Sequence, residues 1–299
     1  TGVFASLYDE GRITRKNATH PFWVEASAAS IARYRQIEAE SGITFFSDAG
    51  ALMFGPPTWV DGIEQAALGL DVTSQRFDAG EMARRFPYFA NPEGWHGAYE
   101  ATDAGHISPR RLVAAQTEAA RRAGAEVMAD VVAGLDGQTV VLQTGTRRTF
   151  DHVLIAAGAM SDHVLGRAPV LHVYRRTAAL FGVSEGEAKR LSGMPSVVHG
   201  PPAETYLLPP IRYPDGKIFL KLGTDPVDIP LESPDEMCAW FNGGGDPSVR
   251  DRLEGQMRDL MPDLTVTGVS MMPCMTTWTD NLLPEIATVE PGVTVCTGG

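Results

Sequence analysis

The sequence is informative first for the motifs it does not contain. Its 299 residues include no G-x-G-x-x-G turn, no Walker phosphate loop, no H-E-x-x-H zinc motif and no C-x-x-C pair. Taken residue by residue, it carries no complete fingerprint for a dinucleotide, a nucleoside triphosphate or a structural metal, and we expect no metal site. Its three cysteines, Cys238, Cys274 and Cys296, are too few and too scattered for a disulfide framework. This favours a reducing compartment, and we expect the cytoplasm.

Long apolar runs and excess positive charge are also missing. No stretch approaches the ~20 apolar residues that a membrane-spanning helix needs. The formal net charge is -12 and the isoelectric point is about 5.0. Because an acidic surface repels phosphate backbones and anionic lipids, we expect neither nucleic acid nor a membrane as a partner. The composition, 43% hydrophobic and 21% charged, is that of an ordinary globular protein and indicates no oligomeric state.

Helical and strand patterns alternate along the chain, which predicts a mixed α/β fold. The expected helices cover residues 25–41, 109–123, a segment starting at 234, and 247–261. The last three begin where serine or aspartate precedes a proline, a typical helix start. The expected strands cover residues 43–46, 51–54, 126–128, 139–143, 153–157, 172–176, 205–208, 218–222, 266–271 and 293–297.

Two local features would suit a bound anion or cofactor. Arg12 and Arg15, three residues apart, would share one face of a helical turn and bind a carboxylate or phosphate; the alternative is a solvated basic patch. The apolar run from Val153 to Ala157 ends in Gly158. Such a run suits a buried strand of a parallel sheet whose carboxyl end approaches a cofactor; the alternative is an ordinary core strand and turn.

Two further features are single side chains of chemical interest. Lys221 interrupts the apolar strand pattern of residues 219–223. It would either face a cleft and stabilise negative charge formed in a reaction, or be the outward member of an alternating strand. Cys274 would be a nucleophile, an attachment point for a cofactor, or a small buried hydrophobe. None of the four features is decisive alone.

Their order and spacing resemble the flavin oxidase family that includes monomeric sarcosine oxidase, N-methyltryptophan oxidase and pipecolate oxidase, within the D-amino acid oxidase superfamily. The sequence R-I-T-R at 12–15 is similar to the family's R-I-I-R, and residues 44–56 are similar to its F-x-K-T-G-V-L-V-F-G-P. Residues 99–120 resemble its E-P-x-x-G-x-L strand and helix, and residues 151–161 its strand ending in G-A-W-S. Residues 219–223 match G-L-K-L-G, residues 274–277 resemble C-M-Y-T, and residues 293–299 resemble the strand before G-F-S-G-H-G-F-K. The resemblance covers essentially the whole chain.

The resemblance implies an α/β fold of two interleaved domains. Residues 1–47, 107–168 and 281–299 would form a Rossmann-like FAD-binding domain, and residues 48–106 and 169–280 a substrate domain with a large mixed β-sheet. Family members also have an early G-x-G-x-x-G unit and a late lysine-bearing loop, neither of which has a match here. The FAD-binding domain is therefore expected to be incomplete, as in a fragment that lacks both ends.

The implied activity is FAD-dependent oxidation of a secondary amino acid, N-methyl or cyclic, to an imine, with O2 as acceptor and hydrogen peroxide as product. Lys221 would serve the oxygen reaction, Arg12 would lie close to the flavin, and Arg15 would bind the substrate carboxylate; all three count as catalytic. Tyr206 and Asp225 would complete the substrate pocket. Flavin contacts are implied for Ser6, Arg12, Val131, Ala157, Gly158, Cys274 and Met275.

Cys274 would carry a thioether bond to the 8α carbon of the flavin. Thr276, Met160 and Asp225 replace a tyrosine, a tryptophan and a histidine of the family, which indicates a different substrate pocket. Two alternatives stay open: a flavin dehydrogenase that passes electrons to a quinone or a carrier protein, and a non-catalytic subunit that kept the fold. Nothing in the sequence supports an NAD-dependent enzyme.

Overall fold

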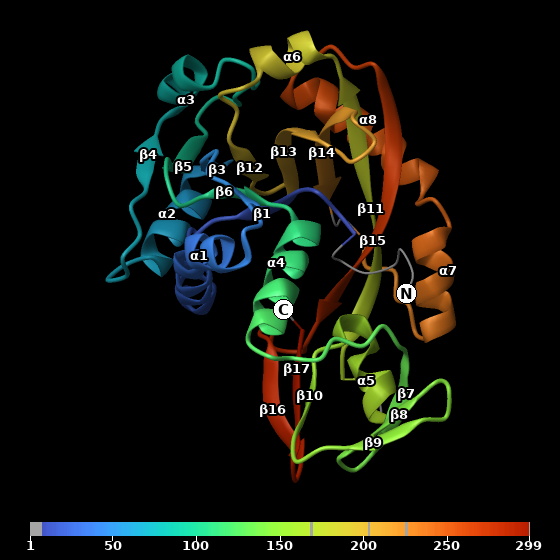
Figure 1. Cartoon of the computed structure of the whole chain (residues 1–299). Helices are drawn as coiled ribbons and strands as arrows, with labels where there is room; N and C mark the ends of the chain where they lie inside the picture. Colours follow the sequence, from blue (N-terminus) through green and yellow to red (C-terminus); the bar gives the residue numbers. More distant parts are fainter. Residues whose placement is uncertain (1–7, 168–169, 203, 225–226, 299) are drawn as a thin grey trace.

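The computed structural model describes residues 8–167, 170–202, 204–224 and 227–298. One large sheet with its helices occupies the upper part of Figure 1, and a smaller sheet lies below it. Two long strands, β11 (His172–Val183) and β15 (Gly268–Trp278), run side by side from the large sheet down toward the smaller one. The predicted mixed α/β fold with a large mixed sheet is confirmed.

The large sheet has eight strands in the order β15-β11-β14-β13-β12-β3-β5-β4. All neighbouring pairs are antiparallel except β12 and β3, which are parallel. Its other strands are β3 (Ala51–Gly55), β4 (Gln75–Phe77), β5 (His96–Glu100), β12 (Ser196–His199), β13 (Thr205–Arg212) and β14 (Ile218–Thr224). All eight strands fall within the residues expected for a substrate domain.

One face of the large sheet forms the main hydrophobic core. Phe181, Leu207 and Leu222 point into this core, where Leu253 and Met257 of α8 (Pro247–Leu260) pack against them. Side chains alternate between the two faces of a strand. On each of these strands, the residues next to the core residues therefore point to the opposite face of the sheet. The other helices are α1 (Pro21–Ser41), α2 (Pro57–Ala66), α3 (Ala79–Arg85), α4 (Pro109–Arg122), α5 (Ser161–Leu165), α6 (Glu185–Arg190) and α7 (Pro234–Asn242).

Three small sheets complete the described part of the chain. The lower sheet has the order β10-β17-β16, with β10 (Val153–Ile155) parallel to β17 (Val293–Thr297) and antiparallel β16 (Glu285–Glu290) at its edge. The meander β7 (Val132–Asp136), β8 (Thr139–Leu142) and β9 (Arg147–Thr149) packs against it. The third sheet is β1 (Arg12–Thr14), β6 (Gly105–Ile107) and β2 (Phe46–Ser47). The predicted parallel pairing of the run that starts at Val153 is confirmed, but the predicted burial is wrong: β10 is an edge strand that ends at Ile155, and Leu154 is 61% exposed.

Local capping explains where the helices begin. Helices α4, α7 and α8 start at the three prolines predicted from the sequence, each after a serine or aspartate whose side chain accepts a backbone N–H. Helix α1 starts at Pro21, four residues before the predicted start, because the His20 ring accepts the N–H of Phe22 at 3.2 Å. The predicted strand at 126–128 is wrong: Val127 and Met128 are exposed and lie in an irregular segment.

One short motif has a structural explanation. Residues 182–186 read G-V-S-E-G, the spacing that surrounds the nucleophilic serine of many hydrolases. Here the serine, Ser184, is the N-cap of α6, and its hydroxyl accepts the N–H of Glu187 at 3.2 Å. Its backbone is extended (φ -74°, ψ 164°) rather than strained as in a nucleophile elbow. The motif therefore gives no support to a hydrolase.

His199, the last residue of β12, packs at a tilt against two aromatic rings. Its ring centre lies 4.6 Å from that of Phe54 and 4.7 Å from that of Trp95. Its Nδ1 atom has no hydrogen-bond partner among the described residues. Burial lowers the pKa of His199 to about 4, so the imidazole is neutral at pH 7.

We expect His199 to make the protein less stable as the pH falls from 7 to 4.5. Because its pKa is lower in the folded chain than in the unfolded chain, the unfolded state takes up a proton between about pH 6.5 and pH 4. The stability is present above pH 6.5 and is lost as the pH approaches 4. H199F keeps an aromatic ring between the two neighbours and should remove about 2 kcal/mol of this pH dependence, measured by urea unfolding at both pH values.

Phe89, whose ring stacks on that of Phe54 at 6.2 Å, offers the matched control. F89L removes packing without removing a titrating group, so it should lower the unfolding free energy equally at pH 7 and pH 4.5. A pH dependence of H199F equal to that of the wild type would contradict the role of the buried neutral imidazole.

Candidate active site

Lys221 and Tyr206 lie on the face of the large sheet that points away from the core. Tyr206 on β13 pairs with Gly223 on β14, two residues beyond Lys221, and alternate residues share a face. A Cβ atom at Gly223 would lie 2.4 Å from the Tyr206 hydroxyl, so the glycine makes room for the ring. The Lys221 Nζ atom lies 5.5 Å from the centre of the same ring. The structure thus brings these two predicted site residues together.

Cys274 lies on the same face, farther along the sheet. It pairs with Arg176 on β11, four residues from Leu180, which is the β11 partner of Lys221. With ~3.3 Å per residue and ~4.8 Å between strands, the Cα atoms of Lys221 and Cys274 are roughly 16 Å apart. Thr276, two residues beyond Cys274, has a buried hydroxyl with no hydrogen-bond partner among the described residues. We call this surface, from Tyr206 and Lys221 to Cys274 and Thr276, the platform.

Met275 points to the other side of β15. It packs with Leu171, Val173 and Met237 in a small apolar cluster beneath α7. The carbonyl of Cys274 accepts the indole N–H of Trp240 on α7 at 2.9 Å, which fixes the strand at this point. The Met275 side chain is therefore not brought to the platform.

A buried carboxylate, which the sequence analysis did not single out, holds the Lys221 ammonium group. Nζ lies 2.5 Å from Oδ2 of Asp9 and 3.2 Å from the carbonyl oxygen of Gly11. The Lys221 and Asp9 side chains are only 6% and 5% exposed, so solvent screens the pair little. The Tyr213 hydroxyl donates to Oδ1 of Asp9 at 3.2 Å. Burial and the Asp9 charge raise the pKa of Tyr213, which keeps the phenol protonated.

The neighbouring Glu10 points the other way and is also buried. It accepts the hydroxyl of Ser108 at 2.9 Å and forms an ion pair with Arg110 at 2.9 Å, both at the start of α4. Gly11 then fits against the sheet, since a Cβ there would lie 2.8 Å from a methyl group of Leu208. Residues 9–11 therefore join helix α4 to the platform.

The two predicted arginines do not share a helix face. Arg12 to Thr14 form strand β1, paired with β6, and Arg15 follows the strand, so the predicted helical turn is wrong. The Arg12 side chain is exposed. Residues 12–14 are extended because their backbone pairs with β6. The spacing of the two arginines contains no information about this pairing.

Arg15 forms part of a charged cluster at the end of β5. Its Nη1 donates to the carbonyl of Asn17, and Glu100 accepts the N–H groups of Lys16 and Asn17, each at 2.9 Å. Burial lowers the pKa of Arg15, and the attraction of Glu100 acts in the opposite direction. Burial raises the pKa of Glu100 against the effect of the two backbone donors. The cluster holds the Arg15 and Lys16 cations beside the Glu100 carboxylate at the end of β5.

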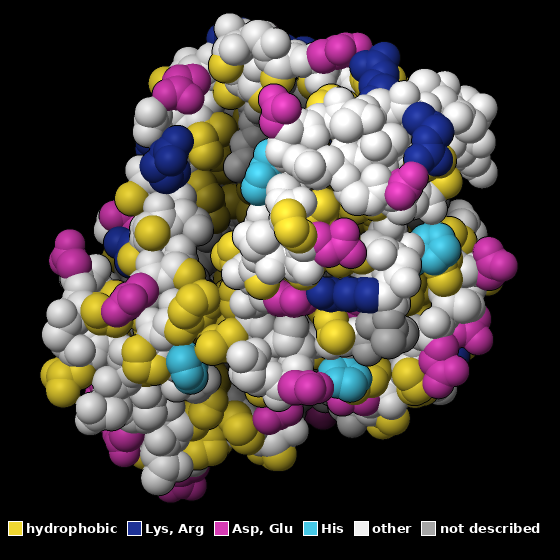
Figure 2. Space-filling view, turned by 90° about the horizontal axis from the view of Figure 1, so that it is seen from below, with side chains coloured by type: hydrophobic (Ala, Val, Ile, Leu, Met, Phe, Trp, Pro, Cys, Tyr) yellow, Lys and Arg dark blue, Asp and Glu magenta, His cyan; other side chains and the backbone are white. Residues whose placement is uncertain are grey.

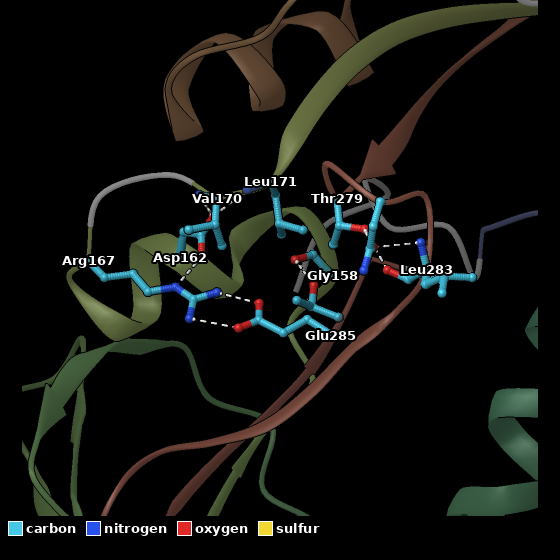
Figure 3. A network of polar contacts seen from close by, with 10 residues as sticks. Gly158, Asp162, Arg167, Val170, Leu171, Thr279, Leu283 and Glu285 are labelled. Atoms are coloured by element: carbon cyan, nitrogen blue, oxygen red, sulfur yellow. Dashed lines mark hydrogen bonds and ion pairs between the residues drawn. The ribbon is translucent and has the colours of Figure 1, made fainter.

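Ala157 and Gly158 form an exposed turn at the carboxyl end of β10. Gly158 has φ +55°, and a Cβ there would meet no atom within 4 Å. Its carbonyl accepts the hydroxyl of Thr297 at 3.1 Å, which joins the turn to β17 (Figure 3). The turn is thus held in place while its outer side stays open to a ligand.

Ion pairs fix the segment that follows this turn. Arg167 lies between Asp162 and Glu285, with N–O distances of 2.6 Å and 2.7 Å (Figure 3). The Asp162 carboxylate also accepts the N–H groups of Val170 and Leu171, at 2.9 Å and 3.0 Å. These contacts connect α5 to β16 and to the start of β11.

A cavity of about 700 Å³ lies between α5, the start of β11 and the start of α7. It reaches Tyr174, which pairs with Thr276 of the platform, and it has Ala159 and Met237 in its walls. Its volume suits a small-molecule site. Seen from below, the surface is hollowed by a deep groove with mainly hydrophobic walls (Figure 2).

The remaining predicted contacts are placed as follows. Val131, just before β7, is 49% exposed and lies apart from the platform strands. Ser6 and Asp225 lie outside the described residues. Among the described residues there is no group of three or more histidine, cysteine or acidic side chains that could hold a metal ion. In the same part of the chain, no helix has the length and apolar character to cross a membrane.

The sequence model for the family "FAD dependent oxidoreductase" matches residues 1–299, and the chain belongs to this family. It is similar to monomeric sarcosine oxidase of Streptomyces avermitilis, 32% identical over 125 residues, which are 41% of this chain and 32% of that protein. The matched part thus spans about a third of that relative. The resemblance inferred from the motifs is confirmed at the level of the family.

Solved structures of the same fold include three oxidases. NikD, described as an unusual amino acid oxidase essential for nikkomycin biosynthesis, has a TM-score of 0.75 and 20% identity, covering 97% of this chain and 78% of that one. Amadoriase I of Aspergillus fumigatus has a TM-score of 0.72 and 17% identity, covering 100% and 74%. A modified fructosyl peptide oxidase of Aspergillus nidulans has a TM-score of 0.74 and 15% identity, covering 99% and 76%. At these identities the likeness shows the fold.

The residues of the platform fit the cofactor that the family name implies. A flavin ring is flat and has carbonyl oxygens and ring nitrogens that accept hydrogen bonds. The platform offers the Lys221 ammonium group and the Thr276 hydroxyl, which has no partner within the described part of the chain, and Cys274 lies between them on the same face. The turn at Gly158 is exposed and a Cβ atom there would meet no atom within 4 Å, so the rest of the cofactor has space to approach the backbone closely.

Proposed function

We propose that the protein oxidises a secondary amino acid, N-methyl or cyclic, to an imine with O2 as acceptor. Family membership and the partial match to monomeric sarcosine oxidase support this reaction class. The observation that carries the proposal is the buried Lys221 ammonium group on the same face as Tyr206, Thr276 and Cys274.

When bound, the flavin would supply the two-electron oxidation of the carbon–nitrogen bond, in which the carbon beside the amine nitrogen loses a hydride, that is, two electrons and one proton. The nitrogen loses its N–H proton to solvent, which leaves the imine, and water then hydrolyses the imine. O2 takes up two electrons and two protons to give hydrogen peroxide. The protein contributes position and electrostatic field to these steps.

Lys221 stabilises the negative charge that develops on oxygen, because a buried ammonium group interacts with such a charge more strongly than a solvated one. Tyr206 borders the substrate side of the platform, beside Lys221. In this proposal Arg15 binds the substrate carboxylate. Its guanidinium group now donates to the Asn17 carbonyl, and it would bind a charged carboxylate more strongly than this neutral acceptor. The proposed contacts to the flavin are made by Arg12, Val131, Ala157 and Gly158.

The test is an anaerobic titration of the flavin-loaded protein with N-methyl and cyclic amino acids. Bleaching of the flavin absorbance, followed by return of the absorbance and formation of one peroxide per flavin on admission of air, is the expected result. No bleaching by any of these compounds would overturn the proposed substrate class. Bleaching without reoxidation by air would favour a dehydrogenase that uses a quinone or carrier protein, an alternative that the neutralising contact of Asp9 on Lys221 supports.

Covalent attachment through Cys274 has its own expected result. In C274A the flavin should be released by acid precipitation, whereas the wild type should keep the yellow colour in the pellet. Cys238 is the matched control: it is also a partly buried cysteine, but it lies on α7, and C238A should keep its flavin. Release of flavin from the wild type itself would contradict the thioether.

A further inference from the structure

The charge on the platform lysine is compensated by a residue that the proposed chemistry does not use. Lys221 Nζ donates to Asp9 at 2.5 Å and to the Gly11 carbonyl at 3.2 Å, which occupies two of its three N–H bonds. Because the two charges lie so close together, the carboxylate cancels part of the ammonium field for a group several ångströms away. The field on the platform is therefore that of a dipole and not that of a free cation.

Asp9 is itself held firmly. Its Oδ1 atom accepts the N–H groups of Glu10 at 2.8 Å and Gly11 at 3.3 Å, and also the hydroxyl of Tyr213. These three donors draw negative charge toward Oδ1 and away from Oδ2, the oxygen that faces Lys221. Tyr213 and Lys221 thus compete for the negative charge of Asp9. The more of this charge that Tyr213 holds at Oδ1, the less of the lysine charge is neutralised at Oδ2.

We infer that Asp9 is a positioning residue that holds the Lys221 ammonium group and, by neutralising part of its charge, restrains electron transfer to O2. This inference rests on the proposed function. Its consequence is a choice of acceptor: O2 reduction builds negative charge beside Lys221, so a weaker positive field slows it and leaves more time for another electron acceptor. Reduction by the substrate builds no such charge on oxygen and should be indifferent to Asp9.

A thermal-unfolding cycle tests the pairing without any flavin. D9N and K221M each leave one buried polar group without its ionic partner and should each lower the melting temperature by on the order of 5–10 °C. D9N/K221M should lose clearly less than the sum of the two. The exposed pair Arg212–Glu185 is the control: E185Q and R212M should each shift the melting temperature by about 1 °C or less, additively. Additive losses for the Asp9–Lys221 cycle would overturn the pairing.

Stopped-flow reoxidation of the flavin-loaded protein tests the role. D9N should speed reoxidation by O2 roughly 10-fold, since removal of the carboxylate charge strengthens the positive field. Y213F removes a donor from Asp9, returns charge to Oδ2 and should slow reoxidation about 2-fold. Anaerobic reduction by the substrate should stay within about 2-fold of the wild type in both variants. A merely structural role would not shift the two variants in opposite directions.

The outcomes separate this inference from the function on which it rests. If K221M reoxidises as fast as the wild type, the proposed role of Lys221 fails and that of Asp9 falls with it. If K221M is slow but D9N is no faster than the wild type, the Asp9 inference alone is overturned. Should D9N fail to fold, Y213F decides: reoxidation at or above the wild-type rate counts against the inference.

Discussion

In K221M, reoxidation of the reduced flavin by O2 is expected to slow by about 10²- to 10³-fold, the usual cost of removing one electrostatic donor from a reaction site. The methionine is similar in length to the lysine side chain but carries no charge, so the shape of the platform is kept. Anaerobic reduction by the substrate should stay largely intact, because no charge develops on oxygen in that half-reaction. Rapid-mixing absorbance measurements of each half-reaction give the two rate constants.

Lys217, in the hairpin before β14, provides the control for this substitution. Its side chain is 73% exposed and forms an exposed ion pair with Asp215. K217M removes the same charge from the protein as a whole but not from the platform, so both half-reactions should match the wild type. Equal slowing of both half-reactions in K221M would point to disturbed folding or flavin binding and would count against the oxygen role.

The largest expected effect on stability comes from G105A. Gly105 has φ +145°, and a Cβ atom there would lie 2.3 Å from the carbonyl oxygen of Ser47 and 2.6 Å from the amide nitrogen of Ala49. Both obstacles are backbone atoms, which cannot rotate away as a side chain can. We expect the unfolding free energy to fall by about 3 kcal/mol or more, measured by urea unfolding, because strained backbone and overpacking act together.

Gly62, in the interior of α2, is the matched glycine for comparison. A Cβ there would meet no atom within 4 Å, and the helical backbone suits alanine. G62A should raise the unfolding free energy by about 0.5–1 kcal/mol. A loss of less than about 1 kcal/mol in G105A would show that β2 and the loop after it move aside easily, and that the β1-β6-β2 sheet is less rigid than its contacts indicate.

The sequence predicted those parts of the fold that depend on neighbouring residues. Proline after a capping side chain marked the starts of α4, α7 and α8, and the apolar run at Val153 indicated a parallel strand. Strand β16 and helix α2 were missed, because their exposed or short apolar patterns differ little from those of loops. The strand expected at 126–128 failed because two apolar residues, Val127 and Met128, form no strand unless another strand offers them backbone partners.

For the site, residues recognised through strand patterns were easier to place than residues that act through distant contacts. Lys221 was singled out because a charge interrupts an apolar strand, and the structure brings it to the platform with Cys274. Asp9 was not, since its partner lies 212 positions away along the chain and a surface aspartate would look the same. A signal did exist: an acidic pair, Asp9 and Glu10, is separated by only Gly11 from the basic R-I-T-R segment.

The pairing of β11 with β15 limits how the protein can move around a substrate. It is unbroken from His172 opposite Trp278 to Gly182 opposite Gly268. Changing the spacing between the Cys274 region and the rest of the sheet would require breaking several of these backbone hydrogen bonds together, at a cost of about 1 kcal/mol each. In the proposed reaction, the movement that admits an amino acid and releases an imine would therefore occur in the connections between strands, while the pairing of these two strands is kept.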